Sequence, residues 1–273
     1  MTAVALEGVV HVYPDGTRAL DDVGLEVPAG GRVAIVGQNG SGKTTLVRHL
    51  NGLLRPTEGQ VLLDGRDVRD VRVAHLSASV GLVFQNPDRQ IFAGRVRSEV
   101  SFGPRNLGVR GSELDRRVAD ALEAVGLTAE ADLNPYDLGY SRRKLLSLAS
   151  VLAMQTPVVV LDEPTTGQDA PGVARVRSIV DAVAAEGRTV IAISHDMRFV
   201  AESFERVVVM RAGRVILDGS PGDVFGEPNW SALATTYLEP PLVATVGASL
   251  GLGPTPTERA LVEALAARSG SPA

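Results

Sequence analysis

The stretch Gly37-Gln-Asn-Gly-Ser-Gly-Lys-Thr-Thr45 decides the fold of this chain. It follows the apolar run Val33–Val36 and precedes residues 46–50, whose apolar side chains have helical spacing. A glycine-rich turn between a strand and a helix lets backbone N–H groups approach an anion, and the helix adds the positive end of its dipole. The spacing fits the phosphate loop of nucleotide-binding proteins. A turn that binds nothing is a much weaker interpretation, because strand, loop and helix occur in the required order.

Within this loop, charge and hydroxyl groups have separate tasks. Lys43 offers a compact positive charge for the outer phosphates, and Thr44 offers a hydroxyl to Mg²⁺. We therefore expect a nucleoside triphosphate with Mg²⁺ as the ligand. The expected nucleotide-binding residues of the loop are Gly37, Asn39, Gly40, Ser41, Gly42, Lys43, Thr44 and Thr45.

The composition limits the remaining possibilities. At 273 residues the chain has room for one or two domains. A net charge of −5 argues against nucleic acid as a partner, and the lack of cysteine excludes disulfides and thiolate metal sites. The N-terminus has no signal-peptide pattern. The longest apolar segment, Leu242–Leu252, is too short to cross a bilayer, so a role at a membrane requires a partner.

Lysine is almost absent from this chain. Of its 27 basic lysine and arginine residues, only Lys43 and Lys144 are lysines. Codon bias is a sufficient explanation for the arginines. One of the two lysines nevertheless lies in the phosphate loop, where a point charge is better suited than a planar guanidinium.

Hydrophobic periodicity predicts alternating strands and helices, and hence a three-layer α/β core with a mainly parallel sheet. An antiparallel β region opens the chain, a helical subdomain covers about 86–154, and the ATPase-like domain as a whole covers 1–225, followed by an extension over 226–273. A capping-box pattern predicts a helix start at Ser112–Asp115. The expected strands cover 9–12, 25–27, 33–36, 60–63, 80–84, 158–161, 189–193, 206–210 and 215–217; the expected helices follow the loop to about 53 and cover 112–125, 141–152, 171–186, 196–203 and 258–267.

Polar residues follow four of the apolar strands. They are the phosphate loop, Gln85, the pair Asp162–Glu163, and His195. In open α/β sheets the ligand lies outside the carboxyl ends of the strands, so one nucleotide can meet all four. We expect Asp162 to hold Mg²⁺ and Glu163, on the opposite face of the strand, to face the attacking water.

Three further residues, His195, Gln85 and Tyr13, give less specific signals. His195 is expected to contact the γ-phosphate or the attacking water, although a lone histidine after a strand is usually structural. Gln85 can reach Mg²⁺ or that water through its amide. Tyr13 can stack on adenine, although an isolated aromatic residue more often belongs to the core.

Over residues 4–225 the chain resembles the ATPase subunits of ATP-binding cassette (ABC) transporters. The segments 37–45 and 158–163 resemble the Walker A and Walker B motifs, and Gly167–Asp169 the D-loop. Gln85 matches the Q-loop, His195 the switch histidine and Tyr13 the aromatic A-loop. The resemblance implies ATP as the nucleotide, hydrolysis with Glu163, His195 and Gln85 as catalytic residues, and Thr44, Gln85 and Asp162 at the metal.

A finer resemblance concerns Val83–Phe92 and Phe102–Gly108, which are similar to the energy-coupling factor ATPases that drive uptake of vitamins and of cobalt or nickel ions. In that family the segment after the Q-loop receives helices of the membrane subunits, which we expect of Asn86–Phe92. The alternative is that this segment only caps the helical subdomain. The resemblance implies a peripheral subunit at the cytoplasmic face of the membrane, held there by membrane subunits.

The chain departs from the family at its signature motif. The pattern Leu-Ser-Gly-Gly-Gln is replaced by Leu138-Gly-Tyr-Ser-Arg142, which brings a bulky ring to a glycine position. Ser141 can still cap the helix, and an anion across an interface would relieve the repulsion among the cations at 142–144. In the family each ATP is held between one Walker A and the signature of the other subunit. We therefore expect a heterodimer with a second ABC ATPase that has a standard signature; the alternative, a homodimer, would have two impaired sites.

Three functions therefore remain open at the sequence level. The first is an ATP-hydrolysing motor of an importer, and the second is a soluble ABC-type ATPase that is not coupled to transport. The third is a subunit that holds ATP without turning it over, which Glu163 and His195 disfavour.

Overall fold

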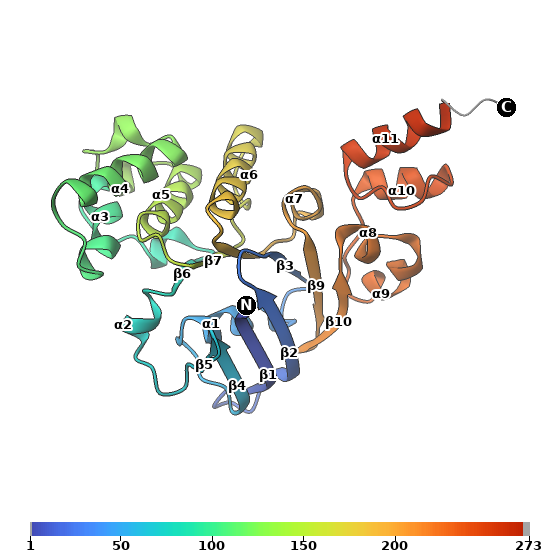
Figure 1. Ribbon diagram of the computed structural model, residues 1–273, viewed down its shortest axis with the longest axis horizontal. Coiled ribbons are helices and arrows are strands. Elements are labelled where there is room, and N and C mark those ends of the chain that lie inside the picture. The colour runs from blue at the N-terminus through green and yellow to red at the C-terminus, as the bar shows by residue number, and fades with distance from the viewer. Residues whose placement is uncertain (1, 270–273) are drawn as a thin grey trace.

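Two β-sheets form the frame of the molecule in the computed structural model, which describes residues 2–269 (Figure 1). The larger sheet has the order β10-β9-β3-β8-β7-β6, and all neighbours in it are parallel except β9 and β10. Its strands are β3 (Arg32–Val36), β6 (Val80–Val83), β7 (Val158–Asp162), β8 (Thr189–Ile193), β9 (Arg206–Arg211) and β10 (Arg214–Gly219). The smaller, antiparallel sheet has the order β2-β1-β4-β5, with β1 (Thr2–Val12), β2 (Arg18–Pro28), β4 (Glu58–Leu63) and β5 (Arg66–Asp67).

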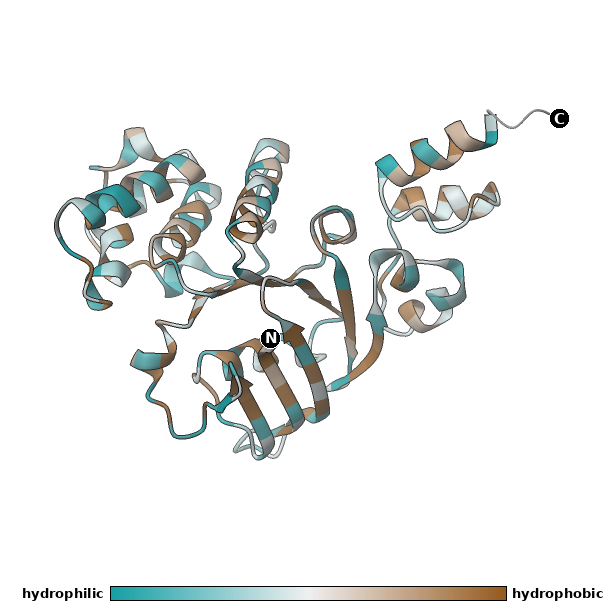
Figure 2. Ribbon diagram, viewed as in Figure 1, coloured by the Kyte–Doolittle hydropathy of each residue, from teal (hydrophilic) through white to brown (hydrophobic). Residues whose placement is uncertain are grey.

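The central parallel strands are apolar because they are covered on both faces. Every residue of β6, β7 and β8 is buried, and their runs of valine, leucine and isoleucine appear brown in Figure 2. Side chains alternate between the two faces of a strand, so each strand contributes to two cores. Val159 and Leu161 belong to the core on the helical side, whereas Val158 and Val160 belong to the core shared with the antiparallel sheet.

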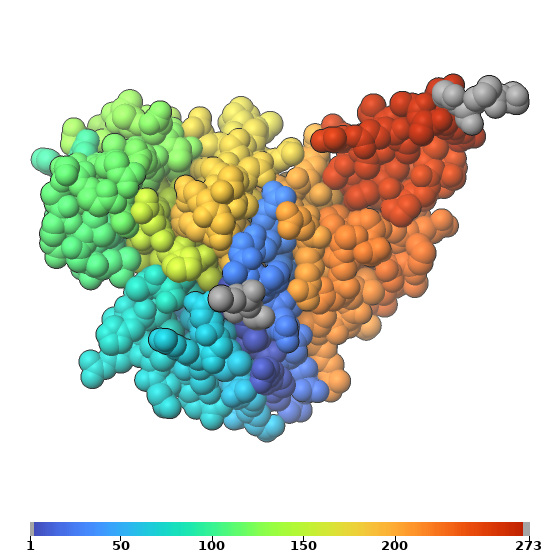
Figure 3. Space-filling view, viewed as in Figure 1, coloured from blue at the N-terminus to red at the C-terminus, as the bar shows by residue number. Residues whose placement is uncertain are grey.

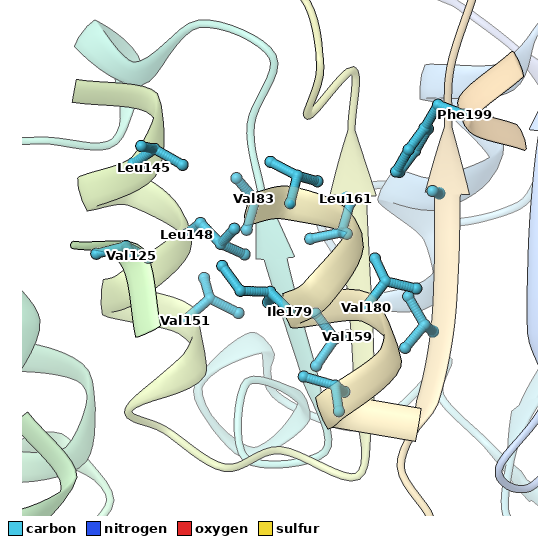
Figure 4. Packing of buried hydrophobic residues seen from close by; sticks show 14 of the residues in the cluster. Val83, Val125, Leu145, Leu148, Val151, Val159, Leu161, Ile179, Val180 and Phe199 are labelled. Atoms are coloured by element: carbon cyan, nitrogen blue, oxygen red, sulfur yellow. The ribbon is translucent and has the colours of Figure 1, made fainter. Parts of the chain in front are cut away.

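Helices pack on one face of the parallel sheet. Figure 4 shows α5 (Tyr140–Leu152) and α6 (Ala170–Ala185) side by side over β6 and β7, with Leu148 and Val151 of α5 close to Ile179 of α6. The helices α3 (Val96–Asn106) and α4 (Gly111–Val125) pack on α5 at the edge of the molecule (Figure 1). The remaining early helices are α1 (Lys43–Leu50), α2 (Val73–Leu76) and α7 (Met197–Ser203), with short 3₁₀ turns at Pro87–Arg89, Thr128–Glu130 and Pro135–Asp137.

The fold class is confirmed, and several local details differ from the sequence prediction. Helix α3 was not predicted, because Gly103 and Pro104 are poor helix formers; they lie near its C-terminal end. Helix α4 begins at Gly111 and its N-cap, Arg110, makes no side-chain cap, so the predicted capping box at Ser112 is wrong. Ser141 does not cap α5 either, since the N-cap is Gly139.

The C-terminal segment consists of short helices, and of these the sequence pattern predicted only the last, over 258–267. They are α8 (Pro221–Val224), a 3₁₀ turn at Glu227–Asn229, α9 (Trp230–Ala234), α10 (Leu242–Ser249) and α11 (Glu258–Ser269). Figure 3 shows α10 and α11 projecting from the rest of the molecule, and no residue of α11 is buried. Within residues 2–269, none of the helices combines the length and the apolar character needed to cross a membrane.

Candidate active site

The four polar strand ends meet at one edge of the parallel sheet, as predicted. Their strands β3, β8, β7 and β6 are consecutive neighbours in the sheet. A cavity of about 290 Å³ lies outside their carboxyl ends. Every predicted site residue except Gly37 lines it: Tyr13, Asn39, Gly40, Ser41, Gly42, Lys43, Thr44, Thr45, Gln85, Asp162, Glu163 and His195.

Two glycines give the phosphate loop its shape. Gly37 has φ 149°, and a Cβ there would lie 2.2 Å from the carbonyl oxygen of Met210. Gly42, the N-cap of α1, has φ 102°, and its Cβ would lie 2.5 Å from the carbonyl oxygen of Ala19. Other residues are therefore excluded by strain and by space. The resulting helix start has no side-chain cap and no acidic residue in its first turn, so its N–H groups are available to an anion.

Lys43 is held by the loop that it serves. Its Nζ donates to the carbonyl oxygens of Gly37, at 2.6 Å, and Gln38, at 2.8 Å. Burial lowers the pKa of Lys43, and the negative charges of Glu163 and Asp162 oppose that shift. An ammonium has three N–H groups, so one remains for a phosphate oxygen. Nearby, the hydroxyl of Ser41 is buried without a hydrogen-bond partner in the described structure, which suits an anion at the same place.

Thr44 and Asp162 form the pair that suits a magnesium ion. The Thr44 hydroxyl lies 3.4 Å from Asp162 Oδ2, and Gln85 is exposed on the same cavity wall. Burial and the neighbouring Glu163 raise the pKa of Asp162, whereas the Thr44 hydrogen bond, Arg48 and Lys144 lower it. Among residues 2–269 no cluster of three or more histidine or acidic side chains forms a metal site. One carboxylate and one hydroxyl are the protein ligands expected where phosphates and waters complete the shell of Mg²⁺.

Glu163 is buried and held by one of its two carboxylate oxygens. Oε2 accepts from the backbone N–H of His195, at 3.3 Å, and from the hydroxyl of Thr166, at 3.2 Å. Oε1 lies 3.1 Å from His195 Nε2 but in no hydrogen-bond alignment, and no other described group donates to it. Burial raises the pKa of Glu163, against the opposing effects of these hydrogen bonds and of Lys43 and Lys144. One oxygen of a fixed carboxylate is therefore free to accept a proton.

His195 is the exposed member of this pair. Its side chain is 42% accessible, whereas that of Glu163 is 4% accessible. Burial and the charge of Lys43 lower the pKa of His195, against the opposing charge of Asp162, and so favour the neutral imidazole. A neutral ring can donate from one nitrogen and accept at the other, which matches a contact with both a phosphate and a water.

Tyr13 reaches the same cavity from the antiparallel sheet. It follows β1, and its hydroxyl lies 3.0 Å from Thr45 Oγ1 in α1. The ring also packs edge-on against His11, with centroids 4.7 Å apart. These contacts fix the aromatic ring at the cavity wall, where a nucleotide base can stack.

The altered signature does not line the cavity, and its charges find partners inside the chain. Arg142 pairs with Glu130, and Arg143 lies 3.1 Å from Asp88. These two residues therefore have acidic partners within the chain, and the relief of their repulsion by an anion across an interface stays a prediction. Lys144 is buried and donates to the carbonyl oxygens of Glu163 and Thr166.

Two of these contact residues were missed at the sequence level. Thr166 holds the Glu163 carboxylate, and Lys144 holds its carbonyl. The scarcity of lysine was a usable signal for Lys144, because both lysines of the chain lie beside the same acidic pair. Nothing in the sequence distinguished Thr166 from its neighbour Thr165.

Comparison with known proteins identifies the family. A family model described as "ABC transporter" matches residues 20–166. The chain belongs to the ABC transporter family. This match confirms the resemblance seen in the sequence. The chain is an ATP-binding cassette of the ABC transporter ATPase class.

Curated relatives of this ABC cassette include energy-coupling factor proteins. The chain is 44% identical over 229 residues to the energy-coupling factor transporter ATP-binding protein EcfA2 of Symbiobacterium thermophilum, covering 81% of this chain and 80% of that protein. It is 41% identical over 247 residues to a protein of Methanosarcina acetivorans named as an ABC transporter ATP-binding protein, covering 90% of this chain. The chain spans only 40% of the length of that second relative.

Solved structures of ABC cassettes share this fold. One is cbiO1 from Clostridium perfringens, described as part of the ABC transporter complex cbiONQ, with 35% identity and a TM-score of 0.75 over 86% of this chain and 95% of that one. Another is a dimeric ATP-binding cassette bound to ADP and Pi, with 26% identity and a TM-score of 0.73 over 80% of this chain and 98% of that one.

Replacement of Lys43 by alanine tests the phosphate loop of this cassette. We expect Lys43→Ala to weaken ATP binding by about 10- to 100-fold, because it removes a charge-assisted hydrogen bond to a phosphate. Equilibrium binding of a fluorescent ATP analogue measures the effect. Arg116→Ala, which removes an exposed cation on α4, is the control and should leave affinity unchanged. Unchanged affinity in Lys43→Ala would contradict the phosphate role.

Proposed function

We propose that this chain is an ATP-hydrolysing subunit of an energy-coupling factor type importer that takes up a vitamin or a transition-metal ion. In this proposal the ATPase domain covers residues 1–225, with its helical subdomain at about 86–154, and 226–273 is an extension. The observation that carries hydrolysis is the state of Glu163, a buried carboxylate with one oxygen fixed by two hydrogen bonds and one oxygen free.

The proposed mechanism follows from this geometry. Glu163 Oε1 accepts a proton from a water that attacks the γ-phosphorus, the bond from phosphorus to the bridging oxygen breaks, and the products are ADP and inorganic phosphate. His195, 3.1 Å from Glu163, orients that water and contacts the γ-phosphate. Lys43 and the N–H groups of the loop hold the phosphates, and Tyr13 stacks on adenine. Thr44, Asp162 and Gln85 would hold Mg²⁺, which would supply positive charge to stabilise the phosphates during the reaction.

The catalytic assignment of Glu163 predicts a separation of binding from turnover. We expect Glu163→Gln to lower kcat by about 10²-fold or more, because the amide cannot accept the proton, while ATP affinity stays the same. Steady-state phosphate release and equilibrium ATP binding measure the two quantities. Glu186→Gln, on an exposed side chain at the end of α6, is the matched control. A variant at 163 with undiminished turnover would remove Glu163 from the mechanism.

Coupling to a membrane protein is supported by an apolar groove beside the Q-loop. The groove, with a volume of about 290 Å³, lies between the edge of the parallel sheet and α3. Phe92 and Phe102 lie on its rim, 59% and 47% exposed, with ring centroids 4.6 Å apart. Leu53 and Val73 are also exposed there. We assign this surface to a helix of a membrane subunit, which would place the chain at the cytoplasmic face of the membrane.

This assignment predicts a loss of association without a loss of nucleotide binding. We expect Phe92→Asp to weaken association with the membrane subunits by at least about 30-fold, since aromatic anchors dominate such interfaces. Co-purification from detergent-solubilised membranes measures association. Val262→Asp, on a comparably exposed residue of α11 at the other end of the molecule in Figure 1, is the control. If Phe92→Asp still assembled fully with the membrane subunits, this groove would not be the surface that couples the ATPase to transport.

The altered signature supports an asymmetric heterodimer. Lys43, Glu163 and His195 form a complete set at this chain's own cavity, whereas segment 138–142 has the bulky Tyr140 at a position where the pattern has a glycine that lets a signature approach a phosphate. A second ABC ATPase with a standard signature would complete the site at this chain's Walker A.

The heterodimer proposal predicts that the chain is slow when alone. We expect its ATPase rate without a partner to be lower by roughly 10²-fold than that of the complete complex, because donors to the γ-phosphate are then missing. Phosphate release per cassette, measured for both preparations, tests this. Equal rates in the two preparations would exclude asymmetry.

A further inference from the structure

The two lysines of the chain interact with the same acidic pair. Lys43 and Lys144 are 6% and 3% exposed, and the charges of Glu163 and Asp162 act on both ammonium groups. All other basic side chains, apart from histidines, are arginines. An ammonium is a compact donor that fits between backbone carbonyls, whereas a guanidinium is a planar fork. The placement of lysine at 144 therefore matches its surroundings as closely as that of lysine at 43.

Lys144 brackets the turn that follows β7. It reaches from the second turn of α5 and donates to the carbonyl oxygen of Glu163 and, at 3.1 Å, to that of Thr166. Glu163 has φ 53°, a left-handed conformation that a glutamate adopts only where its surroundings hold it. The backbone N–H of Thr166 also points to the Glu163 carbonyl, at 3.4 Å. The ammonium thus fixes both ends of the turn that presents the glutamate.

The same turn holds the carboxylate of Glu163. The Thr166 hydroxyl donates to Glu163 Oε2, so the residue whose carbonyl is fixed by Lys144 is also one of the two donors to the carboxylate. Lys144 consequently acts on Glu163 along two routes, through its backbone and through Thr166. It touches neither the cavity nor its contents, since it is absent from the cavity wall.

Two further contacts join the start of α5 to the D-loop. Ser141 Oγ donates to Gln168 Oε1 at 2.7 Å, and Gln168 Nε2 donates to the Ser141 carbonyl at 3.0 Å. The Tyr140 ring covers Gly167, where a Cβ would lie 2.8 Å from it. We use the term clasp for Tyr140, Ser141 and Lys144 together with the turn 163–168. The residues that depart from the signature pattern are the ones that make these contacts.

We propose that Lys144 is a positioning residue for the catalytic Glu163, and that the altered signature works within its own chain as a clasp on the Walker B–D-loop turn. This rests on the proposed function, in which Glu163 accepts a proton from the attacking water. The residues that depart from the family pattern then add a connection between the helical subdomain and Glu163. It ties any movement of α5 to the position of Glu163.

The experiment compares the ATP hydrolysis rates of variants, measured with ATP and Mg²⁺. Each variant is assayed in the complex that co-purifies with this chain. We expect Lys144→Met, which keeps the length and removes the donors, to lower kcat by about 10- to 100-fold with the KM for ATP unchanged. Lys144→Arg, which keeps cationic donors, should recover part of that loss. Arg117→Met, a partly buried cation of α4 paired with Glu113, is the matched control and should retain kcat.

A second pair of variants serves if Lys144→Met does not fold. Ser141→Ala removes the hydroxyl that donates to Gln168, and Gln168→Leu removes both hydrogen bonds of the reciprocal contact. Each should lower kcat, Gln168→Leu at least as far as Ser141→Ala, and the double variant no further than Gln168→Leu. Full kcat in Lys144→Met, or in both of the other single variants, overturns the clasp. Glu163→Gln separates the two proposals: if it abolishes turnover while Lys144→Met does not, only the clasp fails, and if it has no effect, the proposed function fails.

Discussion

The burial of two adjacent carboxylates, Asp162 and Glu163, is the constraint on which the rest of the site depends. Both lie at the end of a strand that is covered on both faces, and burial raises the pKa of each. Buried charges are tolerated only where opposite charges and hydrogen bonds compensate them. The two lysines of the chain supply the charges, and Thr44, Thr166 and the backbone of His195 supply the hydrogen bonds. The proposed catalytic groups and the residues that support them are thus parts of one electrostatic arrangement.

The order of the strands brings these groups together. Because β3, β8, β7 and β6 are neighbours and parallel, the residues that follow them emerge at one edge, although they come from positions as distant as 37 and 195. The antiparallel sheet contributes Tyr13 from a different direction and packs its apolar face against the same strands. The nucleotide cavity therefore lies where two sheets and the N-terminus of α1 converge.

Contacts within the chain give the altered signature and the neighbouring Lys144 a physical explanation. The cations at its start are unfavourable at a helix N-terminus when considered alone. In the folded chain Arg142 and Arg143 have acidic partners, and Lys144 has two carbonyls. Tyr140 and Ser141 contact the D-loop. The segment packs well against its own chain. The replacement of a glycine by Tyr140 therefore affects only how the segment can contact a nucleotide bound to a second subunit.

The sequence by itself determined the fold class, the phosphate loop and all four strand ends of the site, because runs of apolar residues and a glycine-rich loop report local structure directly. It did not determine helix α3, in which tertiary packing overrides the poor propensity of Gly103 and Pro104. It placed the starts of α4 and α5 within one residue but not their caps, because the residues that resemble caps make other contacts or none. Only the tertiary structure decided that Thr166 and Lys144 hold Glu163, and that one oxygen of that carboxylate stays free. Those contacts join residues from different elements. The order of residues along the chain does not specify the distance between side chains that only the folded structure brings together.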